Sequence, residues 1–144
     1  ADIPSTIKGI SVTSIGMEAF YNCRLLKSVT IPDGVTYIGY GAFAKCISLN
    51  DIIIPKSVKS IGDDVVNRCT NLTTVYYAAT YSPYTENPFL NTSSINKIVF
   101  IGEYIPSYIC YDCDNIKEIV LTDSVISIWE YAFYGCDQLE SITC

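Results

Sequence analysis

Residues 31–52 read IPDGVTYIGYGAFAKCISLNDI, and the apolar positions of this stretch recur along most of the chain. The shared pattern is IPxxVxxIGxxAFxxCxxLxxI. Cysteines mark its period, because Cys23, Cys46 and Cys69 are spaced 23 residues apart. A fixed period of this length is the sequence signature of a solenoid, in which each coil is one structural unit that stacks on the next.

Four apolar columns keep the same phase over about six coils. The columns are Val29, Ile52, Val75, Ile98, Ile119 and Ile142; Leu26, Leu49, Leu72, Ile95, Ile116 and Leu139; Ile15, Ile38, Ile61, Tyr84, Ile105 and Ile128; and Phe20, Phe43, Val66, Phe89, Cys110 and Phe133. Cys69 and Cys113 are 44 residues apart, so one coil is two residues short, and Thr92 replaces cysteine in another. The columns predict one apolar core that runs the length of the array.

The IG, AF and Cys elements of the repeat resemble the BspA-type leucine-rich repeat, also described from treponemal proteins, over nearly the whole chain. Members of that family are typically surface proteins of host-associated bacteria and of parasitic protists such as trichomonads. They are implicated in adhesion and in binding host or partner-microbe proteins. The resemblance therefore implies an extracellular or cell-surface location and a protein partner.

Each coil is expected to contain short strands and a helical turn. Residues 49–54 alternate near their end, which places Ile52 and Ile54 on one side of a strand, and Pro55 marks the strand exit because proline cannot donate to a ladder. Residues 41–46, GAFAKC, are expected to form a single helical turn that packing must hold. Residues 1–144 are thus predicted to be one domain, a right-handed α/β superhelix of about six leucine-rich-type coils. Its short parallel strands form one sheet, and its helical turns lie on the opposite side.

The composition argues against several classes of function. The chain has 9 Lys and Arg against 15 Asp and Glu, a net charge of −6, and no His. Nucleic-acid binding needs a basic stripe, which is absent, and without His the commonest general base and metal ligand are missing. No run of about 18 apolar residues predicts a membrane span. We therefore expect no enzyme activity, no cofactor, no metal, no nucleic-acid partner and no membrane insertion.

The cysteine column is expected to face inward as small apolar fillers that donate weakly to backbone carbonyls. Disulfides between neighbouring coils are the alternative, but the five members of the column would leave one cysteine unpaired. Cys110 and Cys113 form a CxxC motif, which elsewhere can bind zinc or carry out redox chemistry. Structural zinc needs a second pair of ligands, and both cysteines already belong to apolar columns. The acidic pairs of residues 63–64 and 112/114 are read as turn residues.

The solvent-facing residues of the strands form the candidate binding surface. One stripe is polar and the other is apolar at its four central positions, and an exposed apolar surface of this kind usually marks an interaction site. The predicted partner-binding residues are Asp51, Ile53, Thr74, Tyr76, Lys97, Val99, Glu118 and Val120. The alternative is that β-branched residues are there because they suit strands.

The irregular coils offer other candidates. The fourth coil carries Tyr81 and Tyr84 where apolar residues stand one coil earlier, as either a tolerated variant or a Tyr-rich contact site. Trp129 occupies the Gly column of the sixth coil, as either a surface anchor or a ring lying over its neighbour.

Neither end of the chain shows a polar capping repeat, which solenoids normally need. The sequence is thus expected to be a piece of a longer array or a unit that stacks end to end. The first favours an adhesion or protein-binding module. The second favours a structural solenoid that associates head to tail into filaments.

Overall fold

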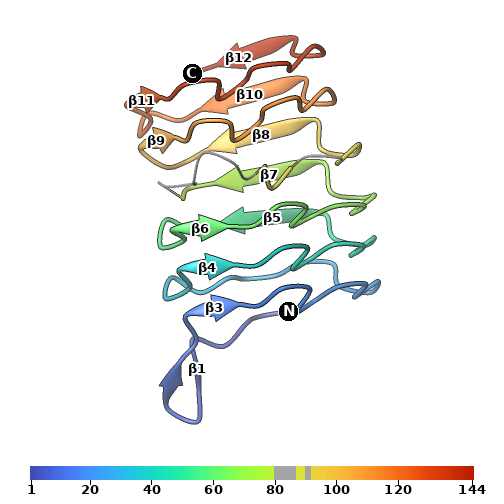
Figure 1. Cartoon of the computed structure of the whole chain (residues 1–144), viewed down its shortest axis with the longest axis vertical. Helices are drawn as coiled ribbons and strands as arrows, with labels where there is room; N and C mark the ends of the chain where they lie inside the picture. The colour runs from blue at the N-terminus through green and yellow to red at the C-terminus, as the bar shows by residue number, and fades with distance from the viewer. Residues whose placement is uncertain (80–86, 90–91) are drawn as a thin grey trace.

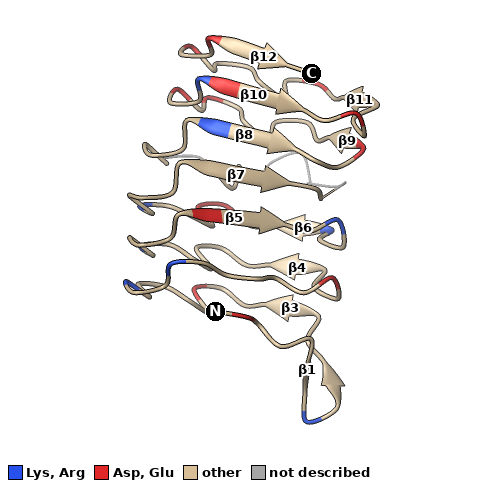
Figure 2. Ribbon diagram, turned by 180° about the vertical axis from the view of Figure 1, so that it is seen from behind, with Lys and Arg blue, Asp and Glu red and all other residues tan. Residues whose placement is uncertain are grey.

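The computed structural model describes residues 1–79, 87–89 and 92–144. Its coils stack into two layers, a main parallel sheet that faces the viewer in Figure 2 and a layer of short strands and turns that faces the viewer in Figure 1. The main sheet has the strand order β12-β10-β8-β7-β5. Its strands are β5 (Asp51–Ile54), β7 (Thr74–Tyr77), β8 (Lys97–Phe100), β10 (Glu118–Leu121) and β12 (Ser141–Thr143).

The second layer contains two further parallel sheets, where the sequence predicted only one sheet in all. A three-stranded sheet consists of β3 (Ser14–Ile15), β4 (Tyr37–Ile38) and β6 (Ser60–Ile61). A two-stranded sheet consists of β9 (Tyr104–Ile105) and β11 (Ser127–Ile128).

The strand register confirms the period read from the sequence. Asp51 pairs with Thr74 and Thr74 with Lys97, steps of 23 residues. Lys97 pairs with Glu118, a step of 21, and Glu118 with Ser141, again a step of 23. The shortened coil is absorbed in the connection between strands, so the sheet stays in register.

The structure has about five turns, one fewer than the six coils predicted. Residues 28–31 carry the strand pattern but form no ladder, and Thr30 makes a single isolated bridge with Asp2. Val29 and Ile31 are nonetheless buried. The inward side of that segment therefore follows the repeat even though its backbone pairs differently.

The predicted columns form the core. The column residues of the middle turns are almost completely buried, including Ile38, Leu49, Ile52, Ile61, Leu72, Val75, Ile98 and Ile105. In the last turn, by contrast, Ile128 is 49% exposed and Ile142 is 50% exposed. A column side chain is therefore hidden where a coil lies on each side of it, which is how repeat proteins build a core.

The predicted helical turns are wrong for the described residues, none of which lies in a helix. In residues 39–46, the amides of Ala42, Ala44 and Cys46 bond to carbonyls three residues back. The intervening amides of Phe43 and Lys45 instead donate to the next coil at 2.8 Å. An α-helix turns every amide along its own axis, so donation to the neighbouring coil replaces helix formation with a chain of tight turns.

The first turn carries an insertion in the form of an antiparallel hairpin of β1 (Thr6–Ile7) and β2 (Ile10–Ser11). Its two-residue loop has φ of 51° at Lys8 and 78° at Gly9, as a type I′ hairpin turn requires. The hairpin projects from the stack in Figure 1. The described part of the chain has no helix able to cross a membrane.

Candidate binding surface

The main sheet brings the predicted partner-binding residues together in two rows. Register aligns the polar row, Asp51 with Thr74, Lys97 and Glu118. It likewise aligns the second row, Ile53 with Tyr76, Val99 and Val120. Because side chains alternate across a strand, both rows lie on the face turned away from the buried columns. We call this surface the sheet face.

The exposure of the second row is uneven. Ile53 is 52% exposed and Tyr76 is 37% exposed, side by side on β5 and β7. Val120 is half-buried, and Val99 is only 9% exposed. Val99 lies between Tyr76 and Val120 in register, and its burial contradicts the expectation that it faces solvent. The open apolar surface is therefore centred on Ile53 and Tyr76.

The polar row supplies a charged edge. Lys97 Nζ lies 2.9 Å from Glu118 Oε1, with side chains 34% and 37% exposed. A pair this exposed contributes about 0.2–1 kcal/mol, so its effect on the fold is small. Asp51 is exposed and Thr74 half-buried at the other end of the row. The row therefore sets the charge pattern that a partner meets more than it stabilises the sheet.

A hollow of about 460 Å³ adjoins the sheet face where the strands end, and the sequence analysis missed it. It is lined by Asp33, Ile53, Pro55, Lys56, Ala78, Ile101, Gly102, Glu103 and Ser124. Ile101 is 37% exposed within it, and the backbone passes close at Gly102, where a Cβ would lie 2.5 Å from Ala78 O. The signal for this hollow was the two-residue shortening after Phe100, which brings residues 101–103 into that corner.

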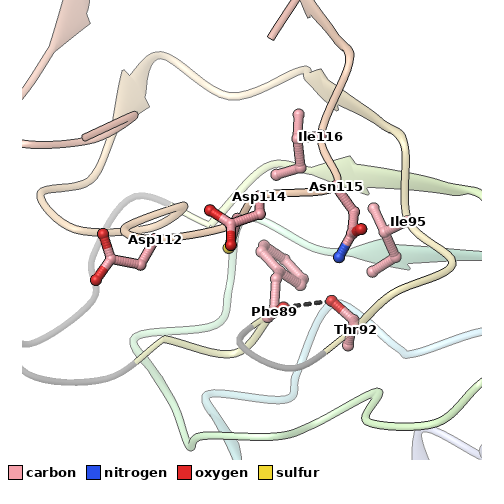
Figure 3. A pocket seen from close by; sticks show the side chains of 8 residues that line it. Phe89, Thr92, Ile95, Asp112, Asp114, Asn115 and Ile116 are labelled. Atoms are coloured by element: carbon pink, nitrogen blue, oxygen red, sulfur yellow. Dashed lines mark hydrogen bonds between the residues drawn. The ribbon is translucent and has the colours of Figure 1, made fainter. Parts of the chain in front are cut away.

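A smaller hollow, about 130 Å³, lies beside the acidic residues of the fifth coil (Figure 3). Ligand pockets usually measure about 300–1,000 Å³, so this one is small for an organic ligand. Figure 3 shows the carboxylates of Asp112 and Asp114 apart from one another. Thr92 Oγ1 donates to the carbonyl of Phe89 nearby. The residues are arranged as turn and column positions, as the sequence indicated.

The cysteine column forms a ladder of weak hydrogen bonds between coils, as predicted. Cys46 Sγ donates to Phe20 O at 3.2 Å, and Cys69 Sγ donates to Phe43 O at 3.1 Å. Cys136 Sγ repeats the contact with Cys110 O at 3.1 Å. Cys23, in the first turn, is exposed. The column thus links each coil to the one before it.

Burial also sets the chemistry of the CxxC motif. Desolvation raises the pKa of Cys113 to about 12, partly opposed by a hydrogen bond from Asn87. Desolvation likewise raises the pKa of the fully buried Cys110 well above 9.0. Metal binding and redox chemistry both need the thiolate, so both thiols are poorly suited to either. Within residues 1–79, 87–89 and 92–144, no cluster of three or more potential metal ligands occurs.

Comparison with known families matches this arrangement. A family model described as a BspA type leucine rich repeat region matches residues 3–104 and 103–144, with 6 copies. The chain belongs to this BspA-type repeat family. Its period, its in-register sheet and its cysteine ladder are thus family features. No curated protein matches the chain.

Solved bacterial leucine-rich repeat proteins have the same fold. The BspA-type chain is 26% identical to one from Eubacterium ventriosum, with a TM-score of 0.66, covering 99% of this chain and 40% of that one. It is 27% identical to one from Bacteroides ovatus, with a TM-score of 0.64, covering 96% and 34%. It is 26% identical to the Treponema pallidum leucine rich repeat protein, with a TM-score of 0.55, covering 98% and 56%. The chain thus spans from about a third to just over half of these structures.

The remaining candidates from the irregular coils have separate outcomes. Tyr81 and Tyr84 lie outside the described residues. Trp129 is 38% exposed, and its ring lies 5.8 Å from that of Tyr104 in the neighbouring coil. Both interpretations of Trp129 therefore describe part of its position, because the ring covers its neighbour and still meets solvent.

Proposed function

We propose that the chain is a non-catalytic protein-binding module of a cell-surface or extracellular protein, and that its sheet face docks onto a partner protein in adhesion. The observation that carries the proposal is the exposed pair Ile53 and Tyr76, set side by side by the register of β5 and β7. Exposed apolar groups gathered on one face usually mark interaction sites, and Tyr is enriched at interfaces.

The surroundings of this pair resemble an interface in layout. Asp51, Thr74, Lys97 and Glu118 give one polar edge, while the hollow beside Ile53 can receive a protruding side chain. Interfaces combine an apolar centre with a polar rim in this way. Membership of the repeat family supports protein binding in general, and the partner is proposed by class only.

The test replaces both exposed apolar residues, in the double variant Ile53→Lys/Tyr76→Lys. Binding is measured on a biosensor against a panel of purified extracellular-matrix and cell-surface proteins. Loss of an interface centre of this kind should weaken binding at least about 30-fold, the equivalent of about 2 kcal/mol. Lysine is avoided at Val99, because its burial would make the change unfold the sheet.

The matched control is Leu25→Lys, which introduces the same charge at an apolar residue that is 91% exposed in the first turn. Circular dichroism and melting temperature should be unchanged in both proteins. Undiminished binding by the double variant, or no binding of the wild-type chain to any protein on the panel, contradicts the proposal.

End-to-end association is the second candidate function. Met17 is 69% exposed in the first turn, and Ile142 is 50% exposed in the last. Apolar surfaces at the two ends of a stack can meet head to tail, and such contacts extend into filaments when they do not close. Sedimentation velocity at several concentrations separates this function from a monomeric binding module.

A further inference from the structure

Four tyrosines of the last two turns form an ordered array on the layer opposite the main sheet. Tyr108 stacks on Tyr131 with ring centroids 5.2 Å apart, and Tyr111 stacks on Tyr134 at 5.1 Å. Contacts within each turn complete the array, at 5.5 Å for Tyr108–Tyr111 and 5.9 Å for Tyr131–Tyr134. Tyr131 is 54% exposed and Tyr134 is 55% exposed. We call these residues the tyrosine array.

The backbone holds the array in place at a cost in conformation. Tyr108 N donates to Glu130 O in the next turn, and Asp112 N donates to Tyr134 O at 2.8 Å. Tyr108 and Tyr131 have φ of 60° and 54°, in the left-handed region that bulky residues rarely enter. The second turn has Gly41 at the equivalent place, with φ of 58°. Two tyrosines at a position suited to glycine point to a use for their rings.

Charge is distributed unevenly along the chain, and the array lies in the acidic part. Residues 101–144 hold eight of the 15 acidic residues but only Lys117 of the 9 basic ones, so they carry −7 of a net −6 and leave +1 to residues 1–100. Lys117 is paired with Glu140 at 3.2 Å. Figure 2 shows acidic segments on the upper turns. The array therefore sits in a negative field.

One carboxylate lies within the array itself. Asp112 follows Tyr111 in the chain, and its side chain lies directly against Gly135, beside Tyr134. Its charge is the main cause that raises the pKa of Tyr111 above 10.0. Glu130 precedes Tyr131. Exposed rings and carboxylates thus occur together, the combination that receives a cation through ring faces and ion pairs.

The first turns show how a cation meets a ring in this column. Tyr21, the counterpart of Tyr111, has Lys45 Nζ 4.9 Å above its ring, supplied by the following turn. The counterpart of Lys45 beside Tyr111 is Gly135, which has no side chain. The chain thus supplies its own cation to the tyrosine of the first turn, whereas the following turn supplies none to Tyr111.

We propose that the tyrosine array is a second docking surface, distinct from the sheet face, that binds an extended arginine-bearing segment of a partner protein. Guanidinium groups stack on the exposed rings and pair with Asp112 and Glu130. Arginine suits the site better than lysine, because its planar group stacks on aromatic rings and is more weakly hydrated.

Fluorescence anisotropy of a labelled peptide in which arginine alternates with glycine tests the proposal. Lysine and glutamate versions are the matched probes. The arginine peptide should bind the wild-type chain several-fold more tightly than the lysine peptide, and the glutamate peptide should not bind. The double variant Tyr131→Gly/Tyr134→Ala should lose at least about tenfold in affinity for the arginine peptide, since two ring contacts are removed without a change of charge.

Folding does not confuse this test, because glycine at position 131 relieves the left-handed backbone and should keep the melting temperature at or above that of the wild type. The matched control is Tyr37→Ala, a 42% exposed tyrosine outside the array, which should bind as the wild type does. Equal arginine and lysine affinities, or an array variant that binds as tightly as the wild type, overturns the proposal. Binding of a neutral oligosaccharide in place of the arginine peptide overturns it too, and assigns the array to glycans.

Discussion

At the scale of single residues, the cysteine column shows how burial decides chemistry. Cys69, Cys110 and Cys113 are all buried, while Cys23 and Cys144 are exposed. Burial raises the pKa of Cys113 to about 12 and keeps that of Cys110 well above 9.0. The nucleophile in thiol chemistry is the thiolate, so these buried side chains are neutral at ordinary pH and act as packing groups.

Alkylation with iodoacetamide near pH 8 checks this assignment. Cys23 and Cys144 should react first, and Cys69, Cys110 and Cys113 only when the chain is unfolded with denaturant. Peptide mapping by mass spectrometry reads out each site. Labelling of Cys110 in the native protein as fast as Cys144 would show that the CxxC motif is open to solvent and poised for chemistry.

Single residues also show what the sequence predicted well. The inward columns were readable because a 23-residue repeat tests each position several times, and Ile52, Val75 and Ile98 are all buried as expected. Val99 was not, because its burial depends on the size of its neighbours Tyr76 and Val120 in other coils. Exposure on the outer face depends on neighbours across strands, which a single-coil pattern does not contain.

At the scale of the element, the turn segments were predicted as helix because apolar residues three apart suit one helical turn. The structure instead gives alternate amides to neighbouring coils, as with Phe43 N to Val65 O at 2.8 Å. A helix needs only local bonds, so local periodicity cannot distinguish it from turns that bond between coils. The tyrosine array was missed for the same reason, since the alignment of Tyr111 with Tyr134 arises from those cross-coil bonds.

Close stacking of these segments requires glycine where the coils meet. At Gly62 a Cβ would lie 2.6 Å from Tyr40 N, closer than real Cβ atoms come, while at Gly16, in the same column, nothing lies within 4 Å. Gly62→Ala should therefore lower the free energy of unfolding by about 1–3 kcal/mol, the usual cost of overpacking. Gly16→Ala should change it by about 0.5 kcal/mol or less.

Denaturant unfolding of the two variants beside the wild type measures both values. The substitution is identical, so a difference between the positions reports the approach of the coils and not the loss of glycine. Equal effects at both positions would contradict this account of the stacking.

At the scale of the whole molecule, the repeat explains both the rigidity of the scaffold and its division into surfaces. Each coil presents one strand to the main sheet and one set of turns to the opposite layer (Figure 1). Any residue outside the columns is therefore repeated along a face, and binding surfaces arise by varying those positions. Ile53 with Tyr76 on one layer, and Tyr111 with Tyr134 on the other, are examples.

The overall architecture was largely predictable from the sequence, and the number of turns was not. The columns predicted the stack, the parallel strands and the shortened coil. The pairing of residues 28–31 depends on the N-terminal segment, since Thr30 bridges to Asp2, and the hairpin of β1 and β2 alters the first turn. These contacts belong to one end of the stack and do not repeat, so the periodic pattern could not reveal them.

The central claim is that the coils stack in a fixed register, with a step of 21 residues between β8 and β10. Disulfide trapping tests it most directly, in a background carrying Cys23→Ser and Cys144→Ser. Lys97→Cys/Glu118→Cys places two thiols on adjacent strands about 4.8 Å apart, within disulfide reach. Lys97→Cys/Val120→Cys, the pair that an unshortened coil would align, separates them by about 8 Å.

Under mild oxidation the 97–118 pair should form a disulfide in high yield, and the 97–120 pair should remain reduced. Efficient cross-linking of the 97–120 pair, with little or none of the 97–118 pair, would contradict the register on which both proposed binding surfaces depend.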